Sequence, residues 1–309
     1  MQKKLLLTGG TGFVGEHLAK LLNKHNIHIR YILRKEAASE FDCFYIENLD
    51  GTTNWKGAFD NINCVVHMAG IAHNREVNDD EFYNVNTDGT LQLALEAAKN
   101  NVKRFVFIST AGVNGLKTYD KPFNASQKVN PHNAYAKSKY LAEKGLFDIS
   151  NNTGMEVVII RPPLVYGRNA PGNFELLAKL IEKTPVLPFG LIDNKRDFVS
   201  VENLADLILK CTMHSSINGH VFFASDDKTL SIKEFTNAIA KGLDKRIIQV
   251  PVPSFLLQAI GKIIGRSEMI QQLISNFEVD IEPTKLNLEW IPPVKIDESL
   301  YKLNLQKRN

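Results

Sequence analysis

Disulfide scaffolds, zinc clusters and membrane spans each need a feature that this 309-residue chain lacks. Its three cysteines, Cys43, Cys64 and Cys211, lie far apart and form no CxxC or Cys/His cluster, so we expect neither a disulfide framework nor a metal site. No apolar run reaches the roughly 18 residues of a membrane-spanning helix. The residues MQKK lead directly into an apolar run instead of a signal sequence. These absences predict a cytoplasmic protein without a spanning segment.

A concentration of one charge is also missing. The 37 basic and 34 acidic residues are scattered along the chain and give a net charge of +3. Nucleic-acid-binding domains usually carry a block or stripe of Lys and Arg. We therefore expect no nucleic-acid partner.

What the chain does have is an alternation of short apolar runs and helical patterns over residues 1–165. Apolar runs separated by helices are typical of parallel strands that are buried on both faces. The predicted fold is therefore α/β, with the doubly wound parallel sheet of a Rossmann-type domain. The expected strands cover residues 4–8, 27–33, 43–46, 64–70, 104–110 and 156–162, and HVFFAS (220–225) is expected to return to the same sheet.

After residue 166 the alternation loosens, which predicts a smaller substrate-binding lobe. We expect residues 1–166 and 196–227 to form the dinucleotide-binding domain, and residues 167–195 and 228–309 to form the lobe. One apolar helix, SFLLQAIGKIIG (254–265), is expected to pack on this lobe because it lacks a strongly basic face. A helix lying on a membrane surface remains the alternative.

Four glycines in TGGTGFVG (8–15) form the strongest local motif. The spacing Gly9-x-x-Gly12-x-x-Gly15 lies between a predicted strand and a predicted helix. Gly9 suits a tight turn, Gly12 lets the backbone approach a pyrophosphate, and Gly15 lets the helix pack closely. The helix N-terminus then offers free N–H groups to the phosphates. This context favours a dinucleotide site over a purely structural glycine loop.

Arg34 stands at the end of the second predicted strand, followed by Lys35. A carboxylate at this place would bind the ribose 2′-hydroxyl of NAD. A guanidinium can instead hold a 2′-phosphate with two hydrogen bonds, which favours NADP. An exposed arginine beside bound NAD remains the alternative.

The sequence NAYAKSKYLAE contains Tyr135-x-x-x-Lys139. On a helix this spacing puts both side chains on one face. An adjacent ammonium is expected to lower the pKa of the phenol and make it a general base near neutral pH. Ser109 and Thr110 follow the preceding strand, where a hydroxyl could lie beside a substrate oxygen.

With these motifs the chain resembles the extended short-chain dehydrogenases/reductases, in particular the nucleotide-sugar epimerase/dehydratase family. The matching features run in order along nearly the whole chain: TGGTGFVG, VVHMAG, NVNTDGT, FISTAGVNG, YAKSK, IRPPLVYG, RDFVSVENLAD and LNLEWIPPV. The resemblance implies a triad of Tyr, Lys and either Ser or Thr, a nicotinamide cofactor (NADP or NAD) and a UDP-sugar substrate.

The resemblance assigns roles residue by residue. Thr110, Tyr135 and Lys139 should be catalytic, Ser109 and Thr110 should contact the sugar, and Asn173 and Arg196 should contact the diphosphate and uridine. Asn48 replaces the aspartate that usually reads the adenine amino group. His67 should line the cofactor or simply pack at a strand end, and Asn86 should support the adjacent loop. The full set of expected cofactor contacts is Gly9, Thr11, Gly12, Phe13, Val14, Gly15, Arg34, Asn48, Leu49, Met68, Ala69, Gly70, Tyr135, Lys139 and Pro162.

Two departures from the family pattern bear on the nucleotide and on the reaction. Many members have a second arginine for the diphosphate near the C-terminal lobe, but the segment SNFEVDIEP contains none. Arg266 or Arg168 is expected to take its place. For Arg196, the alternative to a diphosphate contact is a plain surface charge. The dehydratases carry an Asp-Glu pair where this chain has Ala111 and Gly112. A carboxylic acid is needed to protonate the leaving hydroxyl, so dehydration is not expected.

Two reactions at carbon 4 of the sugar remain. Arg34 and similarity to a branch with 4-ketoreductases for bacterial surface polysaccharides favour reduction of a UDP-4-keto-6-deoxy-hexosamine, with 4-epimerisation of UDP-glucose or UDP-N-acetylglucosamine as the alternative. A non-catalytic dinucleotide sensor or structural subunit is a distant third. The family often dimerises through the helices after NVNTDGT and YAKSK, so a homodimer is expected, although burial of their apolar faces within one monomer explains the pattern equally well.

Overall fold

The computed structural model describes residues 3–34, 41–72, 78–263 and 265–304. Lys35, expected beside the cofactor ribose, lies outside these residues. Among the described residues, no helix combines the length and the apolar character needed to cross a lipid bilayer.

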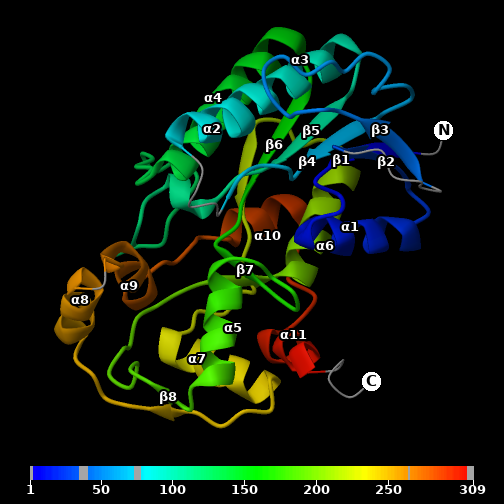
Figure 1. The fold of residues 1–309 in the computed structure, drawn as a ribbon. Helices are drawn as coiled ribbons and strands as arrows, with labels where there is room; N and C mark the ends of the chain where they lie inside the picture. The colour runs from blue at the N-terminus through cyan, green and yellow to red at the C-terminus, as the bar shows by residue number, and fades with distance from the viewer. Residues whose placement is uncertain (1–2, 35–40, 73–77, 264, 305–309) are drawn as a thin grey trace.

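A seven-stranded sheet forms the centre of the larger part of the molecule (Figure 1). Its strand order is β10-β6-β5-β4-β1-β2-β3, and every pairing between neighbouring strands is parallel. The strands are β1 (Lys4–Thr8), β2 (His28–Leu33), β3 (Asp42–Tyr45), β4 (Cys64–His67), β5 (Arg104–Ile108), β6 (Glu156–Arg161) and β10 (His220–Phe223). The predicted doubly wound sheet is confirmed, including the return of residues 220–223. The chain order reverses between β1 and β4, and such a switch point places the ligand crevice at the carboxyl ends of the strands.

Helices cover both faces of the sheet (Figure 1). On one face α1 (Phe13–Lys24) packs against α6 (Val201–Met213). On the other, α3 (Thr90–Lys99) packs against α4 (Ala134–Thr153), and α2 (Asp79–Tyr83) leads into α3 through the π-helical turn η1 (Asn84–Gly89). Because both faces are covered, the central strands β1, β4, β5 and β6 are apolar along most of their length.

The predicted strands 64–70 and 104–110 are longer than the observed ones. β4 ends at His67 and β5 at Ile108. The residues that follow, including Met68, Gly70, Ser109 and Thr110, instead line a cavity at this edge of the sheet. These residues continue the apolar and small-residue pattern of each strand, although they no longer pair with a neighbouring strand. The sequence therefore predicted strand ends that lie too late.

The smaller part of the molecule has its own core, built around an aromatic cluster. Phe198 and Phe235 stack with ring centroids 3.7 Å apart, and Tyr166 and Phe174 complete the cluster. The Tyr166 hydroxyl donates a hydrogen bond of 2.5 Å to Asp226. The elements involved are β7 (Leu164–Tyr166), α5 (Asn173–Lys183), β8 (Val186–Leu187), β9 (Phe198–Ser200), α7 (Ile232–Gly242), β11 (Ile248–Gln249), α8 (Ser254–Ile263), α9 (Ser267–Ile274), α11 (Ile296–Tyr301) and η3 (Lys302–Asn304).

Between α9 and α11 the chain returns to the larger part. Leu288 of α10 (Glu282–Leu288) and Trp290 lie in the core under the seven-stranded sheet, and the Trp290 indole N–H donates a hydrogen bond of 2.8 Å to Asp206. The two parts are therefore joined by several chain crossings, and residues on both can face one cavity.

Candidate functional site

One cavity of about 2140 Å³ extends from the carboxyl ends of the strands to the smaller part of the molecule. Apart from His67, the residues expected to act in catalysis or binding lie on its wall. They are Gly9, Thr11, Gly12, Phe13, Val14, Gly15, Arg34, Asn48, Leu49, Met68, Ala69, Gly70, Ser109, Thr110, Tyr135, Lys139, Pro162, Asn173 and Arg196.

The glycine turn needs its glycines for geometric reasons. Gly9 has a φ of +69°, a backbone conformation that residues other than glycine rarely adopt. A Cβ on Gly15 would lie 2.1 Å from the carbonyl oxygen of Gly9, so only glycine lets α1 approach β1 this closely. Gly12, at the N-terminus of α1, has no side chain to cap the helix. The first N–H groups of α1 can therefore bind an anion.

The part of the wall that follows β4 is shaped by Gly70 and Asn86. A Cβ on Gly70 would lie 2.7 Å from the side-chain oxygen of Asn86 and 3.3 Å from the Lys139 ammonium. Asn86 holds the loop in place, because it accepts a hydrogen bond of 2.9 Å from the Ile71 N–H and donates one of 2.9 Å to the Ile71 carbonyl. The predicted supporting role of Asn86 is thus confirmed.

His67 fits the second of its two expected roles, a histidine packed at a strand end. It is fully buried, and its ring nitrogens bond to the hydroxyls of Thr8 at 2.5 Å and Thr90 at 2.8 Å. Its ring also stacks on Phe107. Burial, with a smaller contribution from Lys139, holds the pKa of His67 well below its usual value, so it is a neutral packed histidine instead of a cofactor contact.

Tyr135 and Lys139 lie one turn apart near the start of α4. Asn133 caps this helix by accepting a hydrogen bond of 2.9 Å from the Ala136 N–H, which fixes where the first turn begins. The Lys139 ammonium donates a hydrogen bond of 2.9 Å to the Ile108 carbonyl at the end of β5. Helix capping and this bond together orient both side chains toward the cavity.

The two hydroxyls after β5 differ in their partners. The Thr110 hydroxyl accepts a hydrogen bond of 3.1 Å from the Gly112 N–H, and it also bonds to the Tyr135 phenol. The Ser109 hydroxyl is buried and has no partner among the described residues. A buried hydroxyl is costly without a partner, so Ser109 offers a hydrogen bond to a molecule in the cavity.

Burial controls the ionisation of this pair. It raises the pKa of Tyr135 to about 12, partly opposed by the Thr110 hydrogen bond. It lowers the pKa of Lys139 to about 8, partly opposed by Glu143. The expectation that Lys139 lowers the pKa of Tyr135 is therefore wrong for the protein without ligands, because desolvation outweighs the effect of neighbouring groups.

Arg196 makes contacts that its sequence context did not suggest. Its guanidinium donates hydrogen bonds to the carbonyls of Gln272 and of Ser275, the latter at 2.8 Å, and lies over the Phe277 ring. It therefore braces the C-terminal end of α9 while it also lines the cavity. Asn173, the first residue of α5, lies exposed on the cavity wall.

The cavity also contains residues that sequence reasoning missed. His132, Glu268, Met269 and Gln272 line it, and His132 Nε2 lies 3.4 Å from a carboxylate oxygen of Glu268. His132 could have been noticed because it stands three residues before Tyr135. Arg266, considered as a substitute for the missing diphosphate arginine, lines the cavity as well.

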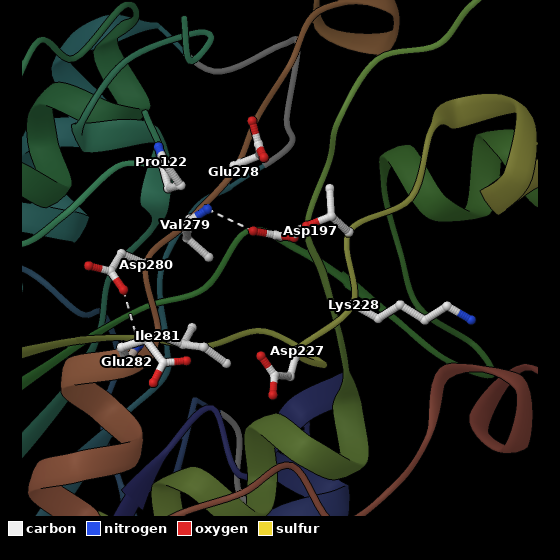
Figure 2. A pocket seen from close by; sticks show the side chains of 10 residues that line it. Pro122, Asp197, Asp227, Lys228, Glu278, Val279, Asp280, Ile281 and Glu282 are labelled. Atoms are coloured by element: carbon white, nitrogen blue, oxygen red, sulfur yellow. Dashed lines mark hydrogen bonds between the residues drawn. The ribbon is translucent and has the colours of Figure 1, made fainter. Parts of the chain in front are cut away.

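A second, much smaller cavity of about 190 Å³ is rich in carboxylates (Figure 2). Asp197 accepts hydrogen bonds from the Val279 N–H at 2.8 Å and the Thr229 hydroxyl at 2.7 Å, and Asp280 accepts one from the Glu282 N–H at 3.0 Å. Within the described part of the chain, no three His, Cys, Asp or Glu side chains come together as metal ligands would. These carboxylates tie residues 277–282 to their neighbours.

Comparisons with known proteins agree with this geometry. The model of the NAD dependent epimerase/dehydratase family matches residues 5–223. A Vibrio cholerae protein described as UDP-glucose 4-epimerase is 39% identical over 306 residues, which cover 96% of this chain and 93% of that protein.

Solved structures show the same fold. UDP-N-acetylglucosamine 4-epimerase from Bacillus cereus superposes with a TM-score of 0.81 at 17% identity and covers all of both chains. UDP-glucuronic acid 4-epimerase from Bacillus cereus, in complex with NAD, superposes with a TM-score of 0.77 at 19% identity over 96% of both chains.

Proposed function

Because the chain belongs to the NAD-dependent epimerase/dehydratase family, we propose that it transfers hydride and a proton at carbon 4 of a UDP-linked hexose. One observation carries this proposal. Thr110, Tyr135 and Lys139 line the same cavity as the glycine turn, Asn173 and Arg196.

The wall of the cavity fits a nicotinamide dinucleotide. The glycine turn and the uncapped N-terminus of α1 suit a pyrophosphate, and the missing side chain of Gly70 lets its backbone lie close to the Lys139 ammonium. When bound, the cofactor supplies or accepts the hydride. The remaining contacts assigned above, from Asn48 and Leu49 to Met68, Ala69 and Pro162, surround the same part of the cavity.

Tyr135 moves the proton in this proposal. In oxidation its phenol oxygen takes the proton of the 4-hydroxyl, and in reduction it returns a proton to the 4-keto oxygen. The hydroxyls of Thr110 and Ser109 hold that same sugar oxygen. Lys139 orients the site through its bond to Ile108 and adds positive charge beside the phenol as long as it is protonated.

The ionisation found here suits one direction more readily. With its pKa near 12, Tyr135 is protonated at neutral pH and ready to donate to a keto oxygen. Oxidation needs the phenolate, so additional positive charge in the cavity must lower the pKa of Tyr135 first. The charges that share the cavity with Tyr135 therefore decide whether its phenol can act as the acid or as the base.

Of the two reactions at carbon 4, we place epimerisation first. The Vibrio cholerae relative, similar over nearly the whole chain, supports it. The second candidate is reduction of a UDP-4-keto-6-deoxy-hexosamine, as expected from the sequence, and it is supported by Arg34. This residue is exposed on the cavity wall directly after β2, where its guanidinium would favour NADP by binding the 2′-phosphate.

Three further expectations remain part of the proposal. Asn173 and Arg196, with Arg266, bind the nucleoside diphosphate, and residues 167–195 and 228–309 act as the substrate-binding lobe. The protein acts in the cytoplasm, in the synthesis of a polysaccharide. It forms a homodimer through α3 and α4, where Leu95 is 40% exposed.

The test begins with the purified protein, whose bound nicotinamide is identified by mass spectrometry. The protein is then incubated separately with UDP-glucose, UDP-N-acetylglucosamine, and a UDP-4-keto-6-deoxy sugar plus NADPH. Interconversion of C4 epimers without added cofactor supports the epimerase, and NADPH consumption with the keto sugar alone supports the reductase. Failure with all three substrates by a protein that binds dinucleotide contradicts the proposal.

A further inference from the structure

His132 brings a further polar side chain to the part of the large cavity that contains Thr110. It stands directly before Asn133, the residue that caps α4, and it lines the cavity. A Cβ on Gly112 would lie 3.3 Å from the Thr110 hydroxyl oxygen and 3.7 Å from Cε1 of His132. The Thr110 hydroxyl and the His132 ring therefore flank the same gap, which the glycine leaves open.

The surroundings of His132 keep its ring uncharged. Burial lowers its pKa below the usual histidine value, partly opposed by Glu268 and by a hydrogen bond to the Gly112 backbone. The side-chain oxygen of Asn133 accepts the helix-capping hydrogen bond, so the amide nitrogen of Asn133 is the atom that lies 3.1 Å from Nε2 of His132. An amide nitrogen can only donate, so Nε2 is an acceptor and carries no proton.

Glu268 of α9 approaches the same nitrogen from the smaller part of the molecule. One of its carboxylate oxygens lies 3.4 Å from Nε2 of His132, and an unprotonated nitrogen cannot donate to it. The Gln272 amide nitrogen lies 3.4 Å from this oxygen, which is the long limit of a hydrogen bond. Glu268 pairs with no Lys or Arg among the described residues. Its carboxylate therefore has acceptor capacity and negative charge to offer to a molecule in the cavity.

Gln272 connects this corner of the cavity to Arg196. The Gln272 carbonyl accepts a hydrogen bond from the Arg196 guanidinium, and its side chain lies against both His132 and Glu268. In the reaction proposed above, carbon 4 of the hexose lies at Thr110 and the diphosphate on carbon 1 lies at Arg196. These two carbons are on opposite sides of the hexose ring. The ring would thus lie beside His132 and Glu268.

We propose that Glu268, held beside the neutral ring of His132, selects uncharged hexoses. Its carboxylate accepts a hydrogen bond from a hydroxyl of the sugar and repels a sugar that itself carries a carboxylate. A hydroxyl has a proton to donate, whereas an ionised carboxylate has only acceptors. Repulsion between the two negative charges grows as the bound ligand displaces water from the cavity. Arg266 does not cancel this charge, because the proposed function engages it with the diphosphate.

This inference rests on the proposed function and narrows its class of sugar. The test is calorimetric titration of the nicotinamide-loaded protein with UDP, UDP-glucose and UDP-glucuronic acid. UDP-glucose should bind at least about tenfold more tightly than UDP-glucuronic acid. Glu268→Gln keeps the shape of the side chain but removes its charge and adds an amide donor. It should bring the two affinities within about threefold of each other, mainly by tighter binding of UDP-glucuronic acid. Its affinity for UDP, which has no sugar beside Glu268, should be unchanged.

The matched control is Glu175→Gln, which removes another exposed carboxylate from the same cavity wall but on α5, where it pairs with Lys179. It should keep the preference for UDP-glucose. Equal affinities of the unaltered protein for the two UDP-sugars, or full discrimination by Glu268→Gln, overturns the inference and leaves the proposed reaction standing. So does an equal loss of affinity for all three ligands in Glu268→Gln, because Glu268 would then only hold α9 in place. Failure of all three ligands to bind the unaltered protein overturns the proposed function as well.

Discussion

The ammonium of Lys139 donates a hydrogen bond of 2.9 Å to the backbone carbonyl of Ile108. This bond joins the helix that carries Tyr135 to the end of the strand that precedes Ser109 and Thr110. Lys139 is only 4% exposed, and its positive charge also lies 4.5 Å from the centre of the Phe107 ring. The site therefore keeps a buried cation one helical turn along α4 from Tyr135, the proposed proton-transfer group.

The buried charge of Lys139 should lower stability at neutral pH. Its pKa is about 8 in the folded protein, below the ordinary lysine value of 10.5, so the unfolded chain binds the proton more tightly. The resulting cost is complete below about pH 8 and disappears as the pH rises to about 10.5. In urea unfolding, the free energy of unfolding of Lys139→Met relative to the unaltered protein should therefore fall across this window, by on the order of 3 kcal/mol.

The control for this prediction is Lys144→Met, at an exposed position on the same helix. Its effect on unfolding should not depend on pH over the same window. An equally flat difference for Lys139→Met would show that the ammonium is not destabilised by burial.

Ser109→Ala should lower activity without lowering stability. The hydroxyl has no hydrogen-bond partner among the described residues, so its removal should leave the melting temperature unchanged or raise it. If a sugar oxygen is its partner, kcat/KM should fall about tenfold. Ser138→Ala is the comparison: the buried Ser138 hydroxyl donates a 2.8 Å hydrogen bond to the Tyr135 carbonyl, so this variant should lose about 1 kcal/mol of stability. Unchanged kcat/KM in Ser109→Ala would remove Ser109 from the substrate site.

Gly15→Ala should impair both folding and dinucleotide binding, whereas Gly12→Ala should impair binding alone. Gly15→Ala places a Cβ 2.1 Å from the Gly9 carbonyl and should both destabilise the fold and abolish dinucleotide binding. In Gly12→Ala the nearest contact is 3.3 Å, so the protein should fold, with weaker dinucleotide binding because the backbone can no longer approach the pyrophosphate. Thermal unfolding and calorimetric titration with NAD and NADP check both. Full affinity in Gly12→Ala would contradict the assigned position of the pyrophosphate.

Arg34→Ala tests the choice of cofactor. Its side chain is exposed, so the variant should fold normally. If the guanidinium holds a 2′-phosphate, affinity for NADP should fall at least about tenfold while affinity for NAD stays the same. Equal affinities before and after the change would remove Arg34 as the reason to consider the reductase.

The sequence predicted best those features that depend on neighbours along the chain. The glycine turn and the Tyr135/Lys139 pair each lie within one short segment, and local backbone geometry brings their members together. The strand pattern was equally informative, because strands buried on both faces need apolar residues throughout. Strand ends were less certain, since Met68 and Ser109 continue the pattern after pairing stops.

Other features depend on segments far apart in the sequence. Arg196 bonds to carbonyls near residues 272–275, and His132 meets Glu268, contacts that no local pattern encodes. The sequence left the role of His67 undecided for the same reason, because its partners Thr8 and Thr90 belong to two other elements. The ionisation of Tyr135 was misjudged because its burial depends on the whole cavity wall.

The most direct test measures hydride transfer by Tyr135→Phe. Both proteins, loaded with nicotinamide, are mixed with whichever UDP-sugar the unaltered protein converts, and the absorbance of the reduced nicotinamide is followed. The account predicts that transfer slows by about 10²- to 10⁴-fold while cofactor affinity is unchanged. Transfer at a rate close to that of the unaltered protein would show that the Tyr135 phenol does not move the proton.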